Sequence, residues 1–179
     1  MQKLFYFICP FLLLTCFGYS QSLTQFKNYG IENTGLSVSF PAEPKKWKAS
    51  YSEDSTVIFT NSVFYEENIY SIFALSLIEK LHPNEVEAIL EYYMETIKQD
   101  YKITQTLGNK TGIKLKQHPA AIGVEEFWQD RFKRKYWVKG WADTKHMGIL
   151  LIISSNELPP KEFESLFLNA FYFPGDKLN

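Results

Sequence analysis

The sequence predicts an α+β fold in which helices pack on an antiparallel sheet. Several segments either alternate apolar with polar residues or form short apolar runs, and short polar connections of hairpin length join them. Two other segments, one in mid-chain and one near the end, place apolar residues at the spacing of one helix face. Many strands with few helices are typical of an antiparallel sheet that carries its helices on a face.

The beginning of the chain has the pattern of a secretory signal peptide. Lys3 precedes the apolar run Leu4 to Phe17, and Gly18-Tyr19-Ser20 then supplies small residues for cleavage. The run is shorter than the roughly 20 residues that a membrane-spanning helix needs. We therefore expect residues 1-20 to be a signal peptide, and residues 21-179 to form one exported domain, periplasmic or secreted.

Two alternatives remain open for this segment. It could stay uncleaved as an anchor, or it could direct lipidation, because Leu13-Leu14-Thr15-Cys16 resembles a bacterial lipobox. Thr15 departs from the Gly, Ala or Ser usual at that position. Contact with a membrane, as a periplasmic or outer-surface lipoprotein, is expected only if Cys16 is lipidated. Both cysteines, Cys9 and Cys16, lie in this segment, so the mature chain would contain no thiol.

Composition indicates a globular protein and argues against one class of partner. Hydrophobic residues make up 45% of the chain and aromatic residues 17%, which is enough for a packed core. The formal net charge is −1. Since nucleic-acid binders usually carry a basic patch or stripe, no nucleic-acid partner is expected.

The first half of the domain is predicted to be mostly strands. The polar start, Gln21 to Gly30, is expected to be a loose arm. Strands are expected around Leu36 to Phe40 and over Val57 to Tyr65. After a hairpin connection, the segment Ile69 to Ile78 has apolar residues at both its odd and its even positions. This pattern predicts a central strand that is covered on both faces.

The clearest helix is predicted over Glu85 to Tyr101. Its apolar residues repeat every three or four positions and form one face. Asn84 can cap it and Glu87 can return the hydrogen bond, as in a capping box. Glu91, Glu95 and Lys98 are expected on its solvent-facing side.

The second half is predicted to contain more strands and a closing helix. A Gly108-Asn109 turn is expected to separate two short strands, and three hairpin-connected strands follow over residues 120–128, 133–142 and 147–154. Pro159-Pro160 is expected to open the final helix, which carries Phe163, Phe167 and Phe171. The residues expected to be buried together are Phe73, Leu75, Leu90, Tyr93, Leu151, Ile153 and Phe167.

Motifs for catalysis or metal binding are weak in this sequence. His82, His118 and His146 lack another ligand-type residue at metal-binding spacing, so ordinary loop histidines are expected, although convergence in space stays open. No Gly-x-Ser-x-Gly elbow or Gly-rich phosphate loop occurs. We therefore expect no enzyme, no catalytic residue and no cofactor, with an unrecognised hydrolase as the alternative.

One strand offers a candidate binding surface. Alternation places Lys135, Trp137, Lys139 and Trp141 on one side, opposite Tyr136, and we call these four residues the Trp/Lys face. Two indoles between lysines could stack on a sugar or on a partner's rings. The alternative, which we favour because packed layers cover both faces of such sheets, is that the face belongs to the core.

Several short motifs resemble those of PsbP-like domains. They are the strand Gly35-Leu-Ser-Val-Ser-Phe-Pro41, the mid-chain helix, the step Gln117-His-Pro-Ala120 and the closing Phe167-Leu-Asn-Ala-Phe171. Gln117 departs from the glycine that is frequent in the family. The resemblance covers nearly all of residues 21-179 and implies an α/β/α sandwich around an antiparallel sheet, with the long helix and the C-terminal helix packed on it.

The resemblance implies little about activity. Family members include extrinsic subunits of the photosynthetic oxygen-evolving complex, bacterial envelope lipoproteins and chaperones for membrane-inserting regions of secreted effectors, and none is clearly an enzyme. A bacterial exported member is expected here rather than the photosystem subunit. We expect a non-catalytic domain that binds or assists another envelope protein. The alternative is a small-ligand or carbohydrate binder that uses the Trp/Lys face, and the oligomeric state stays open.

Overall fold

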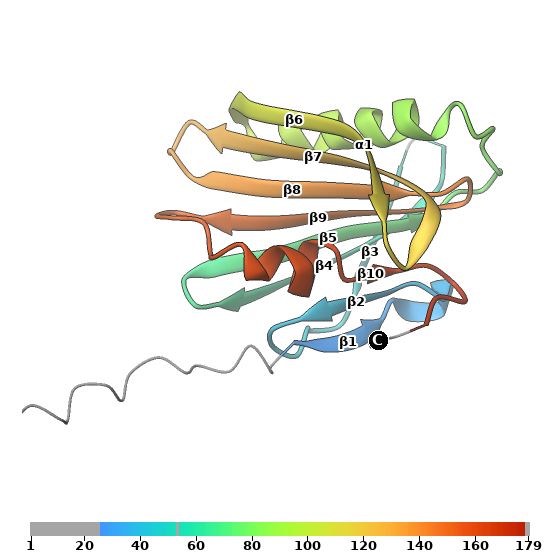
Figure 1. The fold of residues 1–179 in the computed structure, drawn as a ribbon, viewed down its shortest axis with the longest axis horizontal. Coiled ribbons are helices and arrows are strands. Elements are labelled where there is room, and N and C mark those ends of the chain that lie inside the picture. Colours follow the sequence, from blue (N-terminus) through green and yellow to red (C-terminus); the bar gives the residue numbers. More distant parts are fainter. Residues whose placement is uncertain (1–25, 53, 178–179) are drawn as a thin grey trace, which may run out of the picture.

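A seven-stranded antiparallel sheet forms the centre of the domain (Figure 1). The computed structural model describes residues 26–52 and 54–177, so the expected signal peptide and Cys16 lie outside the described residues. The strand order is β3-β4-β5-β9-β8-β7-β6. The strands are β3 (Lys48–Tyr51), β4 (Val57–Tyr65), β5 (Asn68–Ser76), β6 (Ile103–Leu115), β7 (His118–Asp130), β8 (Lys135–Ala142) and β9 (His146–Ser154).

The expected central strand and hairpins are present. β5 lies between β4 and β9, and it is buried on both sides, as its apolar run predicted. β7, β8 and β9 follow one another as antiparallel neighbours. The connection between β7 and β8 is organised by Asp130, whose carboxylate accepts hydrogen bonds from Arg134 Nε at 2.6 Å and from the Tyr136 hydroxyl at 3.0 Å. Burial alone would raise the pKa of Asp130, but these bonds hold it below its ordinary value.

One long helix, α1 (Val86–Tyr101), packs on one face of this sheet over β6, β7 and β8. Its buried face consists of Val86, Leu90, Met94 and Ile97, close to the predicted stripe. The capping-box prediction was wrong. Glu85 occupies the cap position without a side-chain cap bond, and the Asn84 side chain instead contacts the His82 ring at 2.6 Å.

Lys98 does not lie on the solvent-facing side of α1 with Glu91. Its ammonium group reaches Glu126 on β7 at 2.7 Å, and the Trp128 indole N–H donates to the same carboxylate. Burial opposes a charged lysine, but the bonds to Glu126 and Glu95 raise the pKa of Lys98 overall. The helix is therefore tied to β7 by a charged contact that the apolar pattern did not reveal.

The second layer, on the other face, is a small sheet rather than a helical layer. Its order is β1-β2-β10, and all its pairs are antiparallel. The strands are β1 (Lys27–Gly30), β2 (Ser37–Phe40) and β10 (Phe171–Tyr172), and the short helical turn η2 (Glu32–Thr34) joins the first two. The α+β class is thus confirmed, whereas the second helical layer of the expected α/β/α sandwich is absent among the described residues.

The predicted C-terminal helix was wrong. In its place stands η3 (Glu164–Leu168), a five-residue π-type turn, and the chain then leaves it to pair β10 with β2. Tertiary contacts end the turn: the Trp141 indole N–H donates to the Leu168 carbonyl at 2.6 Å, and the Gln117 amide donates to the Asn169 carbonyl at 2.7 Å. These bonds satisfy carbonyls that a longer helix would have paired internally.

Two other strand predictions need correction. The loose arm expected up to Gly30 ends in β1, which pairs with β2 over four residues. The turn expected at Gly108-Asn109 does not form, because β6 continues from Ile103 to Leu115. Its register against β7 shifts repeatedly. Each such bulge accommodates an extra residue in one strand while the pairing of the two strands continues.

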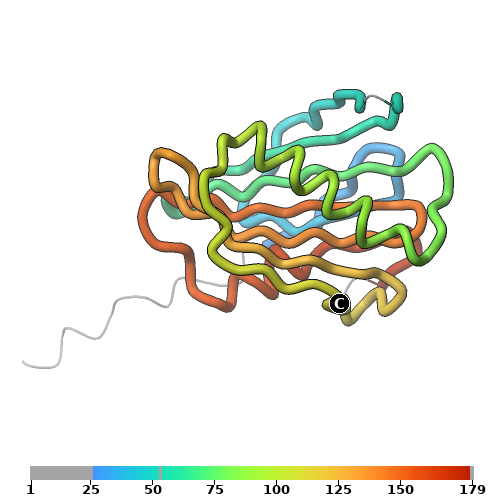
Figure 2. The backbone as a smooth tube through the Cα atoms, turned by 90° about the horizontal axis from the view of Figure 1, so that it is seen from above, coloured from blue at the N-terminus to red at the C-terminus, as the bar shows by residue number. Residues whose placement is uncertain are grey.

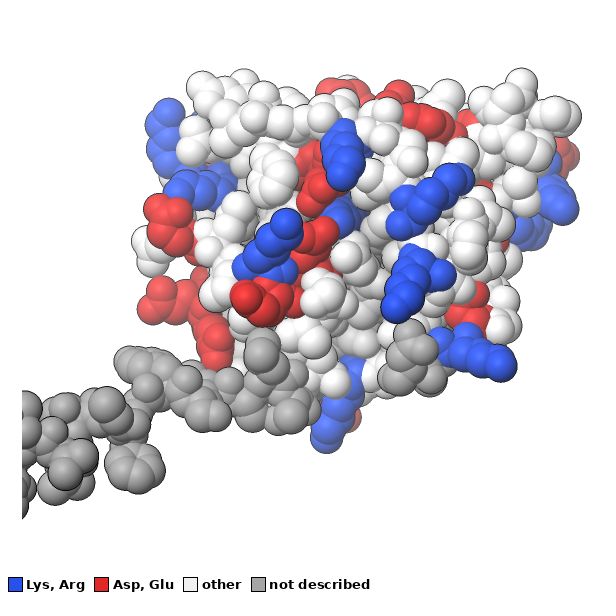
Figure 3. All heavy atoms as spheres, viewed as in Figure 1, with Lys and Arg blue, Asp and Glu red and all other residues white. Residues whose placement is uncertain are grey.

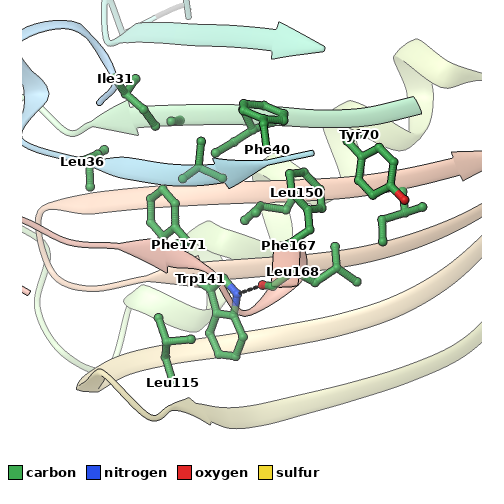
Figure 4. Close-up of a cluster of buried hydrophobic side chains, with 14 of the residues drawn as sticks. Ile31, Leu36, Phe40, Tyr70, Leu115, Trp141, Leu150, Phe167, Leu168 and Phe171 are labelled. Atoms are coloured by element: carbon green, nitrogen blue, oxygen red, sulfur yellow. Dashed lines mark hydrogen bonds between the residues drawn. The ribbon is translucent and has the colours of Figure 1, made fainter. Parts of the chain in front are cut away.

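The sheet separates two apolar cores. Leu75, Leu90, Leu151 and Ile153 lie together under α1, with Phe73 and Tyr93 half-buried beside them. Phe167 is fully buried, but it belongs to the core beneath the small sheet (Figure 4). The predicted core became two because η3, which carries Phe167, packs on the face of the sheet opposite α1.

Candidate functional site

The Trp/Lys face is covered rather than open. Its four residues share one side of β8, as alternation predicted, but Trp137 is 6% exposed, Lys139 4% and Trp141 2%. Trp137 stacks on Phe127 with ring centroids 5.5 Å apart, and Trp141 lies under the Leu168 carbonyl (Figure 4). Only Lys135 reaches the rim, where it binds Glu157 at 2.8 Å. Trp137 and Trp141 therefore do not offer an exposed indole face on which a ligand could stack.

Lys139 is instead the centre of a buried polar cluster. Its ammonium group binds the Glu164 carboxylate, the Asn169 side-chain oxygen at 3.0 Å and, more distantly, Glu125 at 3.6 Å. The Trp137 indole N–H donates to Glu125 at 2.7 Å. The cluster ties β8 to both ends of η3, and its main visible role is to place that turn.

A polar cavity of about 540 Å³ lies beside this cluster at the curled end of β6 and β7. Basic side chains of β6 border it, and Figure 3 shows basic and acidic groups close together on this side of the molecule. Glu125 and Glu164 already neutralise Lys139 inside it. Both carboxylates of the cavity are thus engaged with Lys139, while Lys110, Lys114 and Lys116 give its lining an excess of positive charge.

Two of the three histidines, His118 and His146, meet at Asp143, while the contacts of His82 lie elsewhere. The His82 backbone N–H donates to Glu85 at 2.9 Å, before α1. His118 stacks on Phe173 at 4.3 Å and contacts Asp176 at 2.8 Å, and Asp143 lies 3.7 Å from its other ring nitrogen. His146 is 3.4 Å from Asp143. Within the part of the chain that the structure describes, no group of three or more His, Cys, Asp or Glu side chains is arranged to hold a metal ion.

The most site-like feature is a groove between α1 and the β3–β4 edge of the main sheet, which we call the α1 groove. Its volume is about 580 Å³, within the ~300–1,000 Å³ typical of ligand pockets. In Figure 2, β3 and β4 lie on one side of α1, while β6 and β7 lie on the other. The helix packs on β6, β7 and β8, so it leaves the β4, β5 and β9 part of this face less covered.

The floor of the α1 groove is apolar. It consists of side chains that point to the α1 face of neighbouring strands, with Ile58 opposite Leu75 and Phe73 opposite Ile149 in the pairing. Ile89 and Tyr93 form the helix wall. An apolar group placed here would be removed from water on three sides, which is a favourable transfer.

The rim of the groove is polar and acidic. Asp54 accepts hydrogen bonds from Ser52 and from the Thr56 hydroxyl, the latter at 2.9 Å, and these bonds lower its pKa. Burial raises the pKa of Tyr93 on the facing helix wall. The groove can therefore hold an apolar body and offer oxygen acceptors at its edge.

Sequence reasoning missed this groove. The sequence pattern predicts Phe73 and Tyr93 to be core residues, yet both are only half-buried because they line the groove. The exposed aromatic Tyr92 on α1, outside the buried stripe, was the available signal. The local pattern, however, does not predict which strands of a seven-stranded sheet the helix covers.

No family model matches the sequence, and no curated protein matches it. Among solved structures, the chain is similar to the solution structure of cyanobacterial PsbP (CyanoP) from Synechocystis sp. PCC 6803, with 7% sequence identity and a TM-score of 0.45. The match covers 87% of this chain and 96% of that chain. That protein bears the name of the family whose motifs this sequence resembles.

Proposed function

We propose that this chain is an exported, non-catalytic domain that binds another protein of the cell envelope, and that the α1 groove takes an apolar segment of that partner. The groove is the observation that carries the proposal. It combines a volume of about 580 Å³ with an apolar floor, and it is open to solvent along the exposed side chains of Tyr51 and Tyr92. Sites with these properties bind apolar groups by removing them from water.

The edge of the sheet favours a protein segment as the occupant. β3 is a terminal strand of the main sheet, it borders the groove, and all four of its residues are exposed. Among the described residues it has a neighbouring strand only on the β4 side. An extended peptide could add to the free side of β3 through backbone hydrogen bonds and place alternate side chains in the groove.

Binding of a small ligand by the Trp/Lys face would first require η3 to move away from Trp141.

Export is the first part of the proposal to test. Mass spectrometry of the protein from its native host is expected to show a mature N-terminus near Gln21 and no lipid, because residues 1-20 have the pattern of a cleaved signal. Acylation at Cys16 would place the domain on a membrane surface instead. A retained Met1 would remove the argument for export. No helix among the described residues is both long and apolar enough to cross a membrane.

Binding by the groove is tested by site-specific photo-crosslinking in the native host. The photoreactive residue p-benzoylphenylalanine would replace Tyr92, which is 62% exposed and lines the groove. The matched control replaces Phe132, which is 66% exposed at the β7–β8 turn. We expect one envelope protein to crosslink at position 92 and not at 132, with the attachment mapped to an apolar segment.

Two results would count against this proposal. Equal crosslinking at positions 92 and 132 would indicate chance encounters. Absence of any product at position 92, with the protein folded and exported, would mean that the groove holds no partner segment in the cell.

A further inference from the structure

The charges around the α1 groove have one sign. Asp54 and Asp100 line it, and among the described residues no Lys or Arg does. Lys48 lies on the same face of β3, since it pairs with Thr60 as Ser50 pairs with Ile58, but it stands outside the lining. The hydrogen bonds from Ser52 and Thr56 lower the pKa of Asp54, so this carboxylate keeps its charge. A segment that enters the groove therefore meets negative charge at its edge.

The aromatic residues of the rim favour a positively charged group, as its carboxylates do. Tyr51 is 73% exposed on β3, and Tyr92 and Tyr93 pack edge to face on α1 with ring centroids 5.8 Å apart. The faces of aromatic rings attract ammonium and guanidinium groups, and this attraction adds to that of nearby carboxylates. Long basic side chains can also lay their apolar stems along such rings.

We infer that the partner segment carries a lysine or arginine next to its apolar anchor residues, with the anchors on the groove floor and the basic group at the rim formed by Asp54, Asp100 and the tyrosines. This inference rests on the proposed function and specifies the chemistry of the partner. Both carboxylates are exposed to solvent, so the preference is modest and sensitive to salt.

The test uses three synthetic peptides that differ only in charge. The probes are the acetylated and amidated hexapeptide Gly-Phe-Leu-Lys-Phe-Gly and its versions with Gln or Glu in place of Lys. Isothermal titration calorimetry with the exported protein is expected to give binding about threefold to tenfold tighter for the Lys peptide than for the Gln peptide, and weaker binding for the Glu peptide. High salt should reduce this difference.

Matched variants locate the effect. Asp54→Asn combined with Asp100→Asn is expected to bring the Lys and Gln peptides within about twofold of each other. Because Asp54 also organises its loop, Asp100→Asn alone serves as the milder variant and should lose part of the preference. Glu162→Gln makes the same change of charge at an exposed position before η3, and it should keep the full preference.

Each outcome separates the inference from the proposed function. If the three peptides bind equally, or the Glu peptide binds most tightly, and Ile89→Arg in the groove wall abolishes binding, the inference is wrong while the groove remains a binding site. If no peptide binds at millimolar concentration, the inference is also wrong. Photo-crosslinking at position 92 then decides the proposed function independently.

Discussion

The double substitution of Trp137 and Trp141 by alanine is expected to leave little folded protein at room temperature. Replacing one buried Trp by Ala typically costs about 3–5 kcal/mol, and a domain of this kind has about 5–15 kcal/mol in total. Both indoles are buried, and each donates a hydrogen bond, Trp137 to Glu125 and Trp141 to Leu168. The two losses are not strictly additive, because both side chains lie in the same core.

The surroundings of Trp141 cannot easily rearrange to fill the space that its ring would leave. A Cβ atom at Gly123 would stand 2.3 Å from Cζ3 of Trp141, so the ring fills the space that a side chain on β7 would otherwise take. Removing the ring leaves a cavity bounded by backbone, which cannot collapse easily.

A thermal melt followed by circular dichroism measures this effect. Tyr92→Ala, which removes an exposed ring, is the matched control and should change stability by no more than about 0.5 kcal/mol. An unchanged melting temperature in the double Trp variant, with partner binding reduced, would instead support the Trp/Lys face as a binding surface.

Leu90→Ala is expected to destabilise the domain by about 2–5 kcal/mol, the usual range for a fully buried leucine. Leu90 packs directly on β8, since a Cβ at Gly140 would be only 2.6 Å from Leu90 Cδ1. Urea denaturation measures the free energy of unfolding. Glu91→Ala, one position away and exposed, should stay within about 0.5 kcal/mol of the native protein.

A double-mutant cycle makes this prediction specific. Gly140→Ala alone should cost about 1–3 kcal/mol by crowding Leu90, and it should cost less in the Leu90→Ala background, where the space is free. If Leu90→Ala costs no more than an exposed substitution, or if the two changes are simply additive, α1 does not pack on β8 as described.

The strands and the long helix were predictable because their signals are local. β4 has the predicted bounds, and α1 begins one residue after the predicted start and ends where predicted. Burial on a strand or helix face imposes a period of two or about 3.6 residues, and that period can be recognised without knowing what lies opposite. The shared side of Trp137 and Trp141 followed from the same alternation.

The candidate site depended on information that no local pattern contains. The apolar residues of the last segment have helical spacing, yet η3 ends after one turn because Trp141, Lys139 and Gln117, distant in sequence, bind its last residues. The same turn covers the Trp/Lys face. The charged pair between Lys98 and Glu126 likewise joins α1 to β7 and was invisible in either segment alone.

The sequence by itself thus determined the α+β class, the long helix, the strands β2, β4, β5, β7, β8 and β9, and the faces on which their side chains lie, since these follow from short-range periodicity. It did not predict β1, β3, β10 or the unbroken course of β6. Only the tertiary structure decided what covers each face. A small sheet and η3 close one side of the main sheet, while α1 covers β6, β7 and β8 on the other and leaves the α1 groove beside β3 and β4. The physical reason is that coverage depends on which elements meet across the sheet, and those contacts join residues far apart in the chain.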